Sequence, residues 1–221
     1  MEAVNELTVF ECYGGLFETF VEDIWLVEFK KKDAYGATAR GWGLALVTKE
    51  DVIFMVPKIV DPNGPVRVSL RIAKKDKTTT GVEKMMALTA AGYGRRIGYG
   101  CYTGSEIPIY NKVALKCILC DMAVSGIAFF EAENGRGLRH WLCAVLFWFS
   151  SLRMIQEPKK EDQLHLKAVS LMRRCFKDGD TMEYMPIEAG RYDAHRLDRD
   201  ASEAVSQSTD AIADLMKRER F

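Results

Sequence analysis

The spacing of hydrophobic residues changes along this chain, and that change limits the folds that the chain can adopt. In the first third, short runs rich in β-branched and aromatic residues are separated by Gly, Asp, Asn and Pro. In the clearest run, residues 66–72, apolar side chains alternate with Arg and Ser, so one face of the strand is apolar and the other is basic. Strands are predicted over residues 7–13, 24–29, 42–47, 52–56 and 66–72.

Helical spacing replaces this alternation in the last third. Residues 138–155 are apolar on nearly every face, which predicts a helix buried in the core or in an interface. Residues 164–176 carry a single apolar stripe, which is typical of an amphipathic helix. A final helix is predicted over residues 202–217, and its small apolar stripe needs a partner, either its own core or a neighbouring subunit.

In the middle of the chain, both a helix and strands are predicted. Thr80 and Glu83 form a capping box, and apolar residues then recur at helical spacing, which predicts a helix over residues 81–91. Residues 110–122 and 127–130 are apolar runs that we predict to be buried strands.

Together these patterns predict an α+β fold, with an N-terminal, mostly antiparallel β-sheet region, a helical C-terminal half and an extended C-terminal arm. A mixed α/β core domain is expected over residues 1–180. A linker and arm that end in the amphipathic helix are expected over residues 181–221. A chain of 221 residues lies near the upper end of what one hydrophobic core can hold.

Charge is balanced in total but not along the chain. There are 31 basic and 31 acidic residues, which argues against a protein that coats nucleic acid along its whole surface. Residues 1–29 contain acidic but no basic side chains, whereas residues 67–96 contain eight basic residues and only Asp76 and Glu83 as acids. This distribution favours homo-oligomers that form through the acidic N-terminal region and the C-terminal arm, or an anionic partner for the basic region. Two solvated faces of a monomer are the alternative.

No targeting or membrane-spanning segment is predicted. The N-terminus lacks a basic segment followed by an apolar stretch, so an intracellular, cytoplasmic protein is expected. The longest apolar run, residues 141–149, is shorter than the roughly 20 residues that a membrane-spanning helix needs. Six cysteines are too few for a disulfide scaffold in a chain of this length, and reduced thiols are expected.

Four residues have the types and order of a zinc site: Cys117, Cys120, His140 and Cys143. A paired-cysteine turn, a possible hairpin and then a helix resemble a treble-clef zinc finger. Ile118 and Leu119 stand where a zinc knuckle usually has a glycine. The alternative is that Cys117 and Cys120 are small core residues of a strand. Zinc is the only cofactor that the sequence raises, and otherwise none is expected.

The second candidate binding site is a glycine-rich segment, residues 92–100, that contains two arginines and two tyrosines. Glycines let the backbone approach a ligand closely, arginines bind phosphate, and tyrosines stack on bases. With the basic residues before it, this segment makes up a predicted nucleic-acid or anion-binding set, and a surface loop is the alternative. The set is Arg67, Arg71, Lys74, Lys75, Lys77, Tyr93, Arg95, Arg96 and Tyr99.

Residues for catalysis are few. Only His140, His165 and His195 can act as bases near neutral pH, and no hydrolase, metalloprotease or kinase motif is present. A cysteine nucleophile remains open, because its partners in space need not be near it in sequence. Enzymatic activity is therefore the least favoured hypothesis for the function of this protein, and no catalytic residue is assigned.

The reading that these observations favour is a non-enzymatic, self-associating structural protein with a basic face for nucleic acid or an anionic surface. Viral nucleoproteins, movement proteins and matrix proteins are of this kind, which would imply the cytoplasm of a host cell. The order of basic strand, capped helix, Gly-rich loop and apolar strand in residues 65–120 is similar to the core of rhabdovirus matrix proteins, without a shared motif. The alternatives are a zinc-stabilised binding module and an enzyme.

Overall fold

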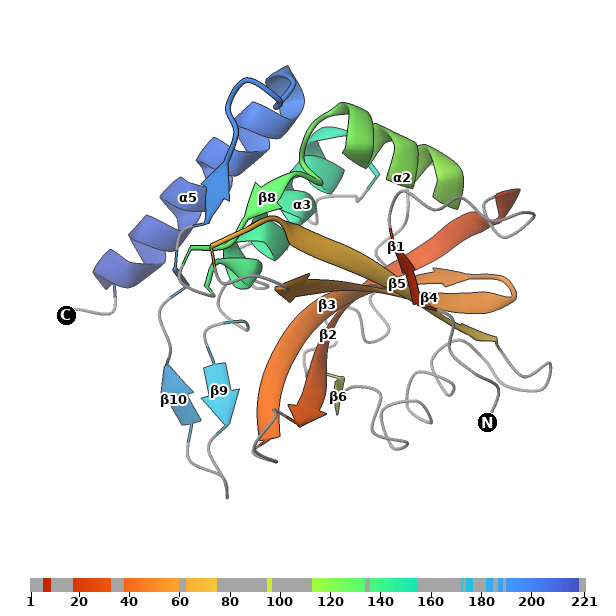
Figure 1. Cartoon of the computed structure of the whole chain (residues 1–221), viewed down its shortest axis with the longest axis horizontal. Helices are drawn as coiled ribbons and strands as arrows, with labels where there is room; N and C mark the ends of the chain where they lie inside the picture. The colour runs from red at the N-terminus through yellow and green to blue at the C-terminus, as the bar shows by residue number, and fades with distance from the viewer. Residues whose placement is uncertain are drawn as a thin grey trace. The chain divides into compact units, whose positions relative to one another are not determined.

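The fold is known from a computed structural model of the 221-residue chain (Figure 1). The structure describes residues 6–8, 18–32, 38–59, 63–74, 95–96, 113–133, 136–154, 172, 174–176, 182–184, 187–188 and 190–218. The chain divides into two compact units. Unit 1 comprises residues 1–58 and 67–119, and unit 2 comprises residues 59–66 and 120–221.

Unit 1 is built on an antiparallel sheet. Its strands lie in the order β1-β5-β4-β3-β2-β6, and β7 also pairs with β2. The predicted strands over residues 24–29, 42–47, 52–56 and 66–72 are confirmed, whereas residues 9–13 lie outside the described part of the chain. The strands are β1 (Glu6–Thr8), β2 (Phe20–Lys32), β3 (Thr38–Thr48), β4 (Asp51–Ile59), β5 (Val66–Lys74), β6 (Arg95–Arg96) and β7 (Val113–Ala114).

The hairpin of β2 and β3 is the longest pairing in this sheet. It runs from Val21↔Thr48 to Lys32↔Thr38, with one irregularity between Val21 and Asp23. At the other end of β3, the Thr48 side chain accepts a hydrogen bond from the backbone N–H of Asp51 at 2.9 Å, which fixes the tight turn to β4. Apolar residues on one face of the hairpin are buried and form the core of the unit: Ile24, Leu26, Leu44 and Leu46.

One strand prediction was wrong. Residues 110–122 were expected to form a buried strand, but Leu115–Val124 is a helix, α2, and residues 113–114 form the short strand β7. Residues 110–112 lie outside the described part of the chain. The reason is visible in burial: Leu115, Ile118, Leu119 and Met122 are buried at helical spacing, whereas the residues between them are exposed. A short apolar run does not by itself distinguish the two structures. The apolar strand was the last element in the order that is similar to rhabdovirus matrix proteins, and this element is a helix in the structure.

Unit 2 is mainly helical. The predicted helix over residues 138–155 is confirmed as α3 (Leu138–Ser151), and the final helix is confirmed as α5 (Arg199–Arg218). Two small antiparallel sheets accompany them, formed by β8 (Phe130–Glu131) with β11 (Arg191–Tyr192) and by β9 (Arg174–Phe176) with β10 (Met182–Tyr184).

Two further predictions in unit 2 needed correction. Residues 174–176 were expected to end an amphipathic helix but form β9, because each of them pairs across to a residue of β10. The predicted strand over residues 127–130 is reduced to its last residue, in β8. The rest of the predicted helix over 164–176, apart from Met172, and the helix over 81–91 lie outside the described residues.

Helix α5 packs against α3. Every residue of α3 from His140 to Phe149 is buried, as expected from its uniform apolar character. The residues of α5 that are buried recur at intervals of three and four and are mostly small, which lets the helices approach closely: Ala201, Ala204, Ser208 and Ile212. The apolar stripe of α5 therefore has a partner within its own chain.

The structure confirms the α+β class: the antiparallel sheet lies in the N-terminal half and the helices lie in the C-terminal half. The boundary between a core of residues 1–180 and an arm of residues 181–221 stays a prediction, and both sides of it belong to unit 2. In the described part of the chain, none of the helices has the length and apolar character that crossing a membrane requires.

Candidate functional sites

His140, on α3, is the centre of a buried polar network in unit 2. Only 2% of its surface is exposed. Its Nδ1 accepts a hydrogen bond from the backbone N–H of Gly190 at 2.9 Å. Its Nε2 lies 3.2 Å from the hydroxyl oxygen of Ser208 and 3.1 Å from that of Thr209, both on α5. The imidazole thus links α3 to two separate parts of the C-terminal arm.

The hydrogen-bond pattern determines which nitrogen of His140 carries the proton. Because Nδ1 accepts from Gly190, the proton of the neutral ring is on Nε2, which donates to the two hydroxyls. Ser208 and Thr209 in turn donate to the backbone carbonyl of Val205, at 2.8 and 2.9 Å. All donors and acceptors in this network are matched.

This pattern is not that of a catalytic Ser–His pair. A histidine that activates serine must accept the hydroxyl proton, but Nε2 of His140 already carries a proton and the Ser208 hydroxyl donates to a carbonyl. Burial also lowers the pKa of His140 from 6.5 to about 4, because the charged form would lose its water. The arrangement favours a neutral histidine that holds helices together.

Two other buried groups adjoin His140. The ring of Tyr192 contacts the His140 ring edge to face, with centroids 5.8 Å apart, and the Phe130 ring at 5.1 Å. In the described structure no atom is placed to hydrogen-bond with the buried hydroxyl of Tyr192. Burial raises the pKa of the Tyr192 hydroxyl, with a smaller contribution from Cys143, and burial likewise raises the pKa of the Cys143 thiol. Both groups are therefore neutral at physiological pH.

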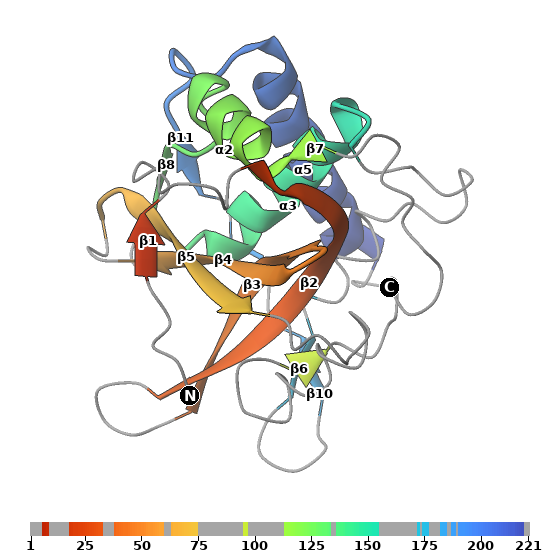
Figure 2. The same ribbon diagram turned by 90° about the vertical axis from the view of Figure 1, so that its right-hand side faces the viewer.

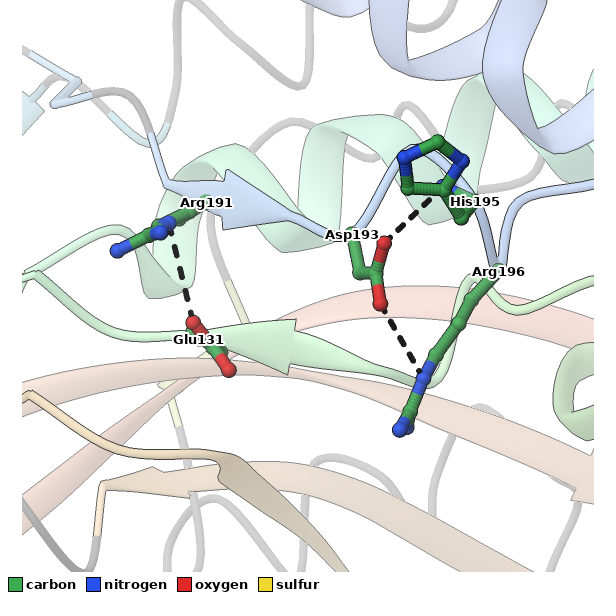
Figure 3. A network of polar contacts seen from close by, with 5 residues as sticks. All are labelled: Glu131, Arg191, Asp193, His195 and Arg196. Atoms are coloured by element: carbon green, nitrogen blue, oxygen red, sulfur yellow. Dashed lines mark hydrogen bonds and ion pairs between the residues drawn. The ribbon is translucent and has the colours of Figure 1, made fainter.

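Exposed polar contacts line the same part of the arm. Arg136 forms an ion pair with Glu188 at 2.7 Å, and Arg191 lies 3.9 Å from Glu131. Figure 3 shows the second pair beside a turn in which Asp193 binds the backbone N–H of His195 at 3.0 Å and the Arg196 guanidinium at 3.4 Å.

The ring of His195 has no part in that turn, since only its backbone N–H binds Asp193. The side chain is exposed, as expected from its position in a charged linker. His165, the third histidine, lies outside the described residues.

Two glycines show how closely the arm lies on the rest of unit 2. A Cβ at Gly126, which has φ +81°, would lie 2.0 Å from the carbonyl oxygen of Arg196. A Cβ at Gly190 would lie 1.8 Å from the ring of Phe130. Neither position can accommodate a side chain without movement of the arm or the ring. These contacts could not be predicted from sequence patterns, because they join residues far apart in the chain.

The predicted zinc residues are not brought together. Among the described residues, which include all four, no three His, Cys, Asp or Glu side chains are grouped so as to hold a metal ion. Cys117 and Cys120 are exposed on α2, whereas Cys143 is buried and His140 uses both nitrogens in hydrogen bonds. The geometry gives the zinc site no support. The two paired cysteines lie on a helix and not, as the alternative had it, in a core strand.

The predicted basic residues fall on two separated strands. Arg67, Arg71 and Lys74 belong to β5, and Arg95 and Arg96 form β6. Three strands, β4, β3 and β2, lie between them in the sheet. At about 4.8 Å per strand, β5 and β6 are roughly 19 Å apart. The four other members of the set lie outside the described residues: Lys75, Lys77, Tyr93 and Tyr99.

Sequence reasoning selected His140 but missed its partners. Ser208, Thr209 and Gly190 lie 68, 69 and 50 residues away from it in the chain. Only the apolar stripe of the last helix, which needed a surface to cover, pointed to contact between the arm and another element.

No protein-family model matches the chain, and neither the curated proteins nor the solved structures include a significant match.

Proposed function

We propose that this chain is a non-enzymatic, self-associating structural protein that presents basic residues to nucleic acid or to another anionic surface. The observation that carries the proposal is the position of β6. Among the strands that the structure describes, Arg95 and Arg96 form the outermost one on this side of the sheet, paired with Glu28 and Val27 of β2. An edge strand has room beside it for a partner, and two adjacent arginines there favour an anionic one.

Charge along β2 supports the self-associating part of the proposal. Glu22 and Asp23 lie near its beginning, and three lysines end it. One strand thus carries acidic residues at one end and basic residues at the other, and it spans roughly 40 Å at 3.3 Å per residue. In two copies arranged head to tail, the acidic end of β2 in one copy lies against the lysines of β2 in the other.

Binding is tested by fluorescence anisotropy with labelled nucleic acid over a range of NaCl concentrations. Phosphate contacts release counterions, so affinity is expected to fall steeply with salt. The substitutions Arg95→Ala and Arg96→Ala together should weaken binding and reduce the slope of log K against log salt by about two. Binding that is absent, or equally strong in the double variant, contradicts the proposal at this strand.

Self-association is tested by size-exclusion chromatography with light scattering at low and high salt. A head-to-tail assembly held by opposite charges dissociates as salt rises, because exposed charges are screened beyond about 10 Å at 0.1 M. Asp23→Asn should shift the distribution toward monomer. A monomer at every protein and salt concentration would exclude self-association.

A further inference from the structure

Among the described residues, the end of the β2–β3 hairpin is a two-stranded ribbon. Pairing between β3 and β4 runs from Val47↔Val52 to Leu44↔Met55, whereas pairing between β2 and β3 continues for six further positions, to Lys32↔Thr38. Figures 1 and 2 both show β2 and β3 running on beyond β4. We call residues 29–32 with residues 38–41 the basic ribbon.

The face that is apolar in the core becomes charged in the basic ribbon. Ile24 and Leu26 of β2 are buried. Because side chains alternate along a strand, Glu28, Lys30 and Lys32 belong to the same face of β2. Along this face of β2 the residue type thus changes from apolar to charged after Leu26. Residues 29–41 contain four basic residues and only Asp33 as an acid.

The register of the basic ribbon puts like charges opposite each other. Lys30 pairs with Arg40, and Lys31 and Lys32 pair with the uncharged Ala39 and Thr38. Directly opposed like charges destabilise a sheet, so this pairing is not explained by stability. The strand β6 adds Arg95 and Arg96 beside β2 at the base of the ribbon, opposite Glu28 and Val27.

We infer that the basic ribbon is a binding element for double-stranded nucleic acid, an inference that rests on the proposed function and names its partner. Its four basic residues, Lys30, Lys31, Lys32 and Arg40, contact two rows of phosphates. The major groove of a DNA duplex admits a two-stranded β-ribbon. Alternation assigns Lys30 and Lys32 to one face and Lys31 to the other. Charges on both faces suit a groove with phosphates on either side, whereas a flat membrane surface is matched by charges on one face.

The test compares full-length protein with a variant that carries Lys30→Gln, Lys31→Gln and Lys32→Gln. Anisotropy titrations use a labelled DNA duplex, an RNA duplex and single strands of the same sequence. The variant should bind duplex at least about tenfold more weakly, and its salt slope should be smaller by about three, since each lost phosphate contact removes roughly 0.9.

Two further proteins serve as controls. Lys49→Gln, Lys116→Gln and Lys217→Gln change the net charge equally at exposed positions and should leave binding unchanged. Lys30→Arg, Lys31→Arg and Lys32→Arg keep the charge and should bind duplex with near wild-type affinity. Circular dichroism and thermal unfolding establish that all variants are folded.

The outcomes separate this inference from the proposed function. Binding of the DNA duplex that the ribbon variant loses and the control keeps supports the inference. Equal losses in the ribbon variant and the charge-matched control, or binding by wild type to single strands or phosphatidylserine vesicles but not to duplex, overturn it and leave the broader function standing. A wild-type protein that binds no nucleic acid and no anionic vesicle overturns both.

Discussion

The His140 network and the basic ribbon are both clusters of polar residues, and they differ in which groups the fold sets beside one another. Around His140, a backbone N–H, an imidazole and two hydroxyls form a chain of matched donors and acceptors that ends at a carbonyl. In the basic ribbon, the register sets Lys30 opposite Arg40. A cluster that the fold completes stabilises the fold, and a cluster of like charges that the fold assembles favours a partner from outside.

This difference assigns the two clusters to different roles even though both contain residues that enzymes and binding proteins use. A histidine beside a serine is a common catalytic pair, but the tautomer of His140 gives it a structural role. Lysines in a strand are commonly solvated surface residues, but their paired register gives them a proposed function. If this assignment holds, fold stability depends on the His140 network and not on the basic ribbon.

Removal of residues 191–221 should have the largest effect. The deletion uncovers the side of α3 that α5 covers and removes β11 and the hydroxyl partners of His140. Each large apolar side chain that becomes exposed costs about 1.5–3 kcal/mol, so unit 2 should lose its stable fold. Thermal unfolding and binding of a hydrophobic dye measure this. A truncated protein that unfolds at the wild-type temperature would show that the arm is dispensable.

The substitution His140→Ala should have the next largest effect on stability. The substitution leaves the N–H of Gly190 without its acceptor, removes the hydrogen bond that Nε2 donates to Ser208, and opens a cavity in a buried site. Such losses destabilise by about 2–4 kcal/mol in the free energy of unfolding. Urea denaturation measures the change. The matched control is His195→Ala, which removes an exposed imidazole and should change stability by less than about 0.5 kcal/mol.

Stability should also depend on pH through His140. Its pKa is about 4 in the folded state and near 6.5 when unfolded, so the unfolded chain binds the proton more tightly. Stability is therefore highest above pH 6.5 and falls as the pH drops toward 4. Between pH 7 and pH 5 this histidine alone should cost about 2 kcal/mol.

A comparison of wild type with His140→Gln isolates this contribution, because carboxylates titrate in both proteins. Tyr192 and Cys143, which adjoin the imidazole, stay neutral over this range because burial raises the pKa of each. The stability of the glutamine variant should fall less steeply with acid. Identical pH profiles would mean that His140 is protonated as readily in the folded protein as in the unfolded chain.

Local pattern predicted those elements whose neighbours are also near in sequence. The alternation in residues 66–72 and the uniform apolar character of residues 138–155 each correspond to an observed strand or helix. Residues 110–122 were assigned wrongly because burial on one side only, at Leu115, Ile118 and Met122, depends on where the core lies. The spacing of apolar residues in so short a run did not show which side of the segment would be buried.

The candidate sites could be predicted only in part, for the same reason. Arg95 and Arg96 were selected from composition, but the strand that pairs with them, β2, precedes them by almost 70 residues. The three lysines of the basic ribbon were not selected, because their significance depends on the β2–β3 register. The run of three lysines is visible in the sequence. It indicates a binding element only once the register of β2 and β3 sets Lys30 opposite Arg40.

The smallest expected change in stability gives the sharpest test of the difference between the two clusters, because this substitution should stabilise the protein whereas the others destabilise it. Lys30→Thr replaces one of two opposed cations with a residue of higher strand propensity. The free energy of unfolding should rise by roughly 0.2–1 kcal/mol, while the affinity for duplex nucleic acid falls. Urea denaturation and anisotropy on the same preparation measure both. A variant that is less stable than wild type would mean that Lys30 contributes to the fold, which would make the basic ribbon a structural feature like His140 and remove the argument for an external partner.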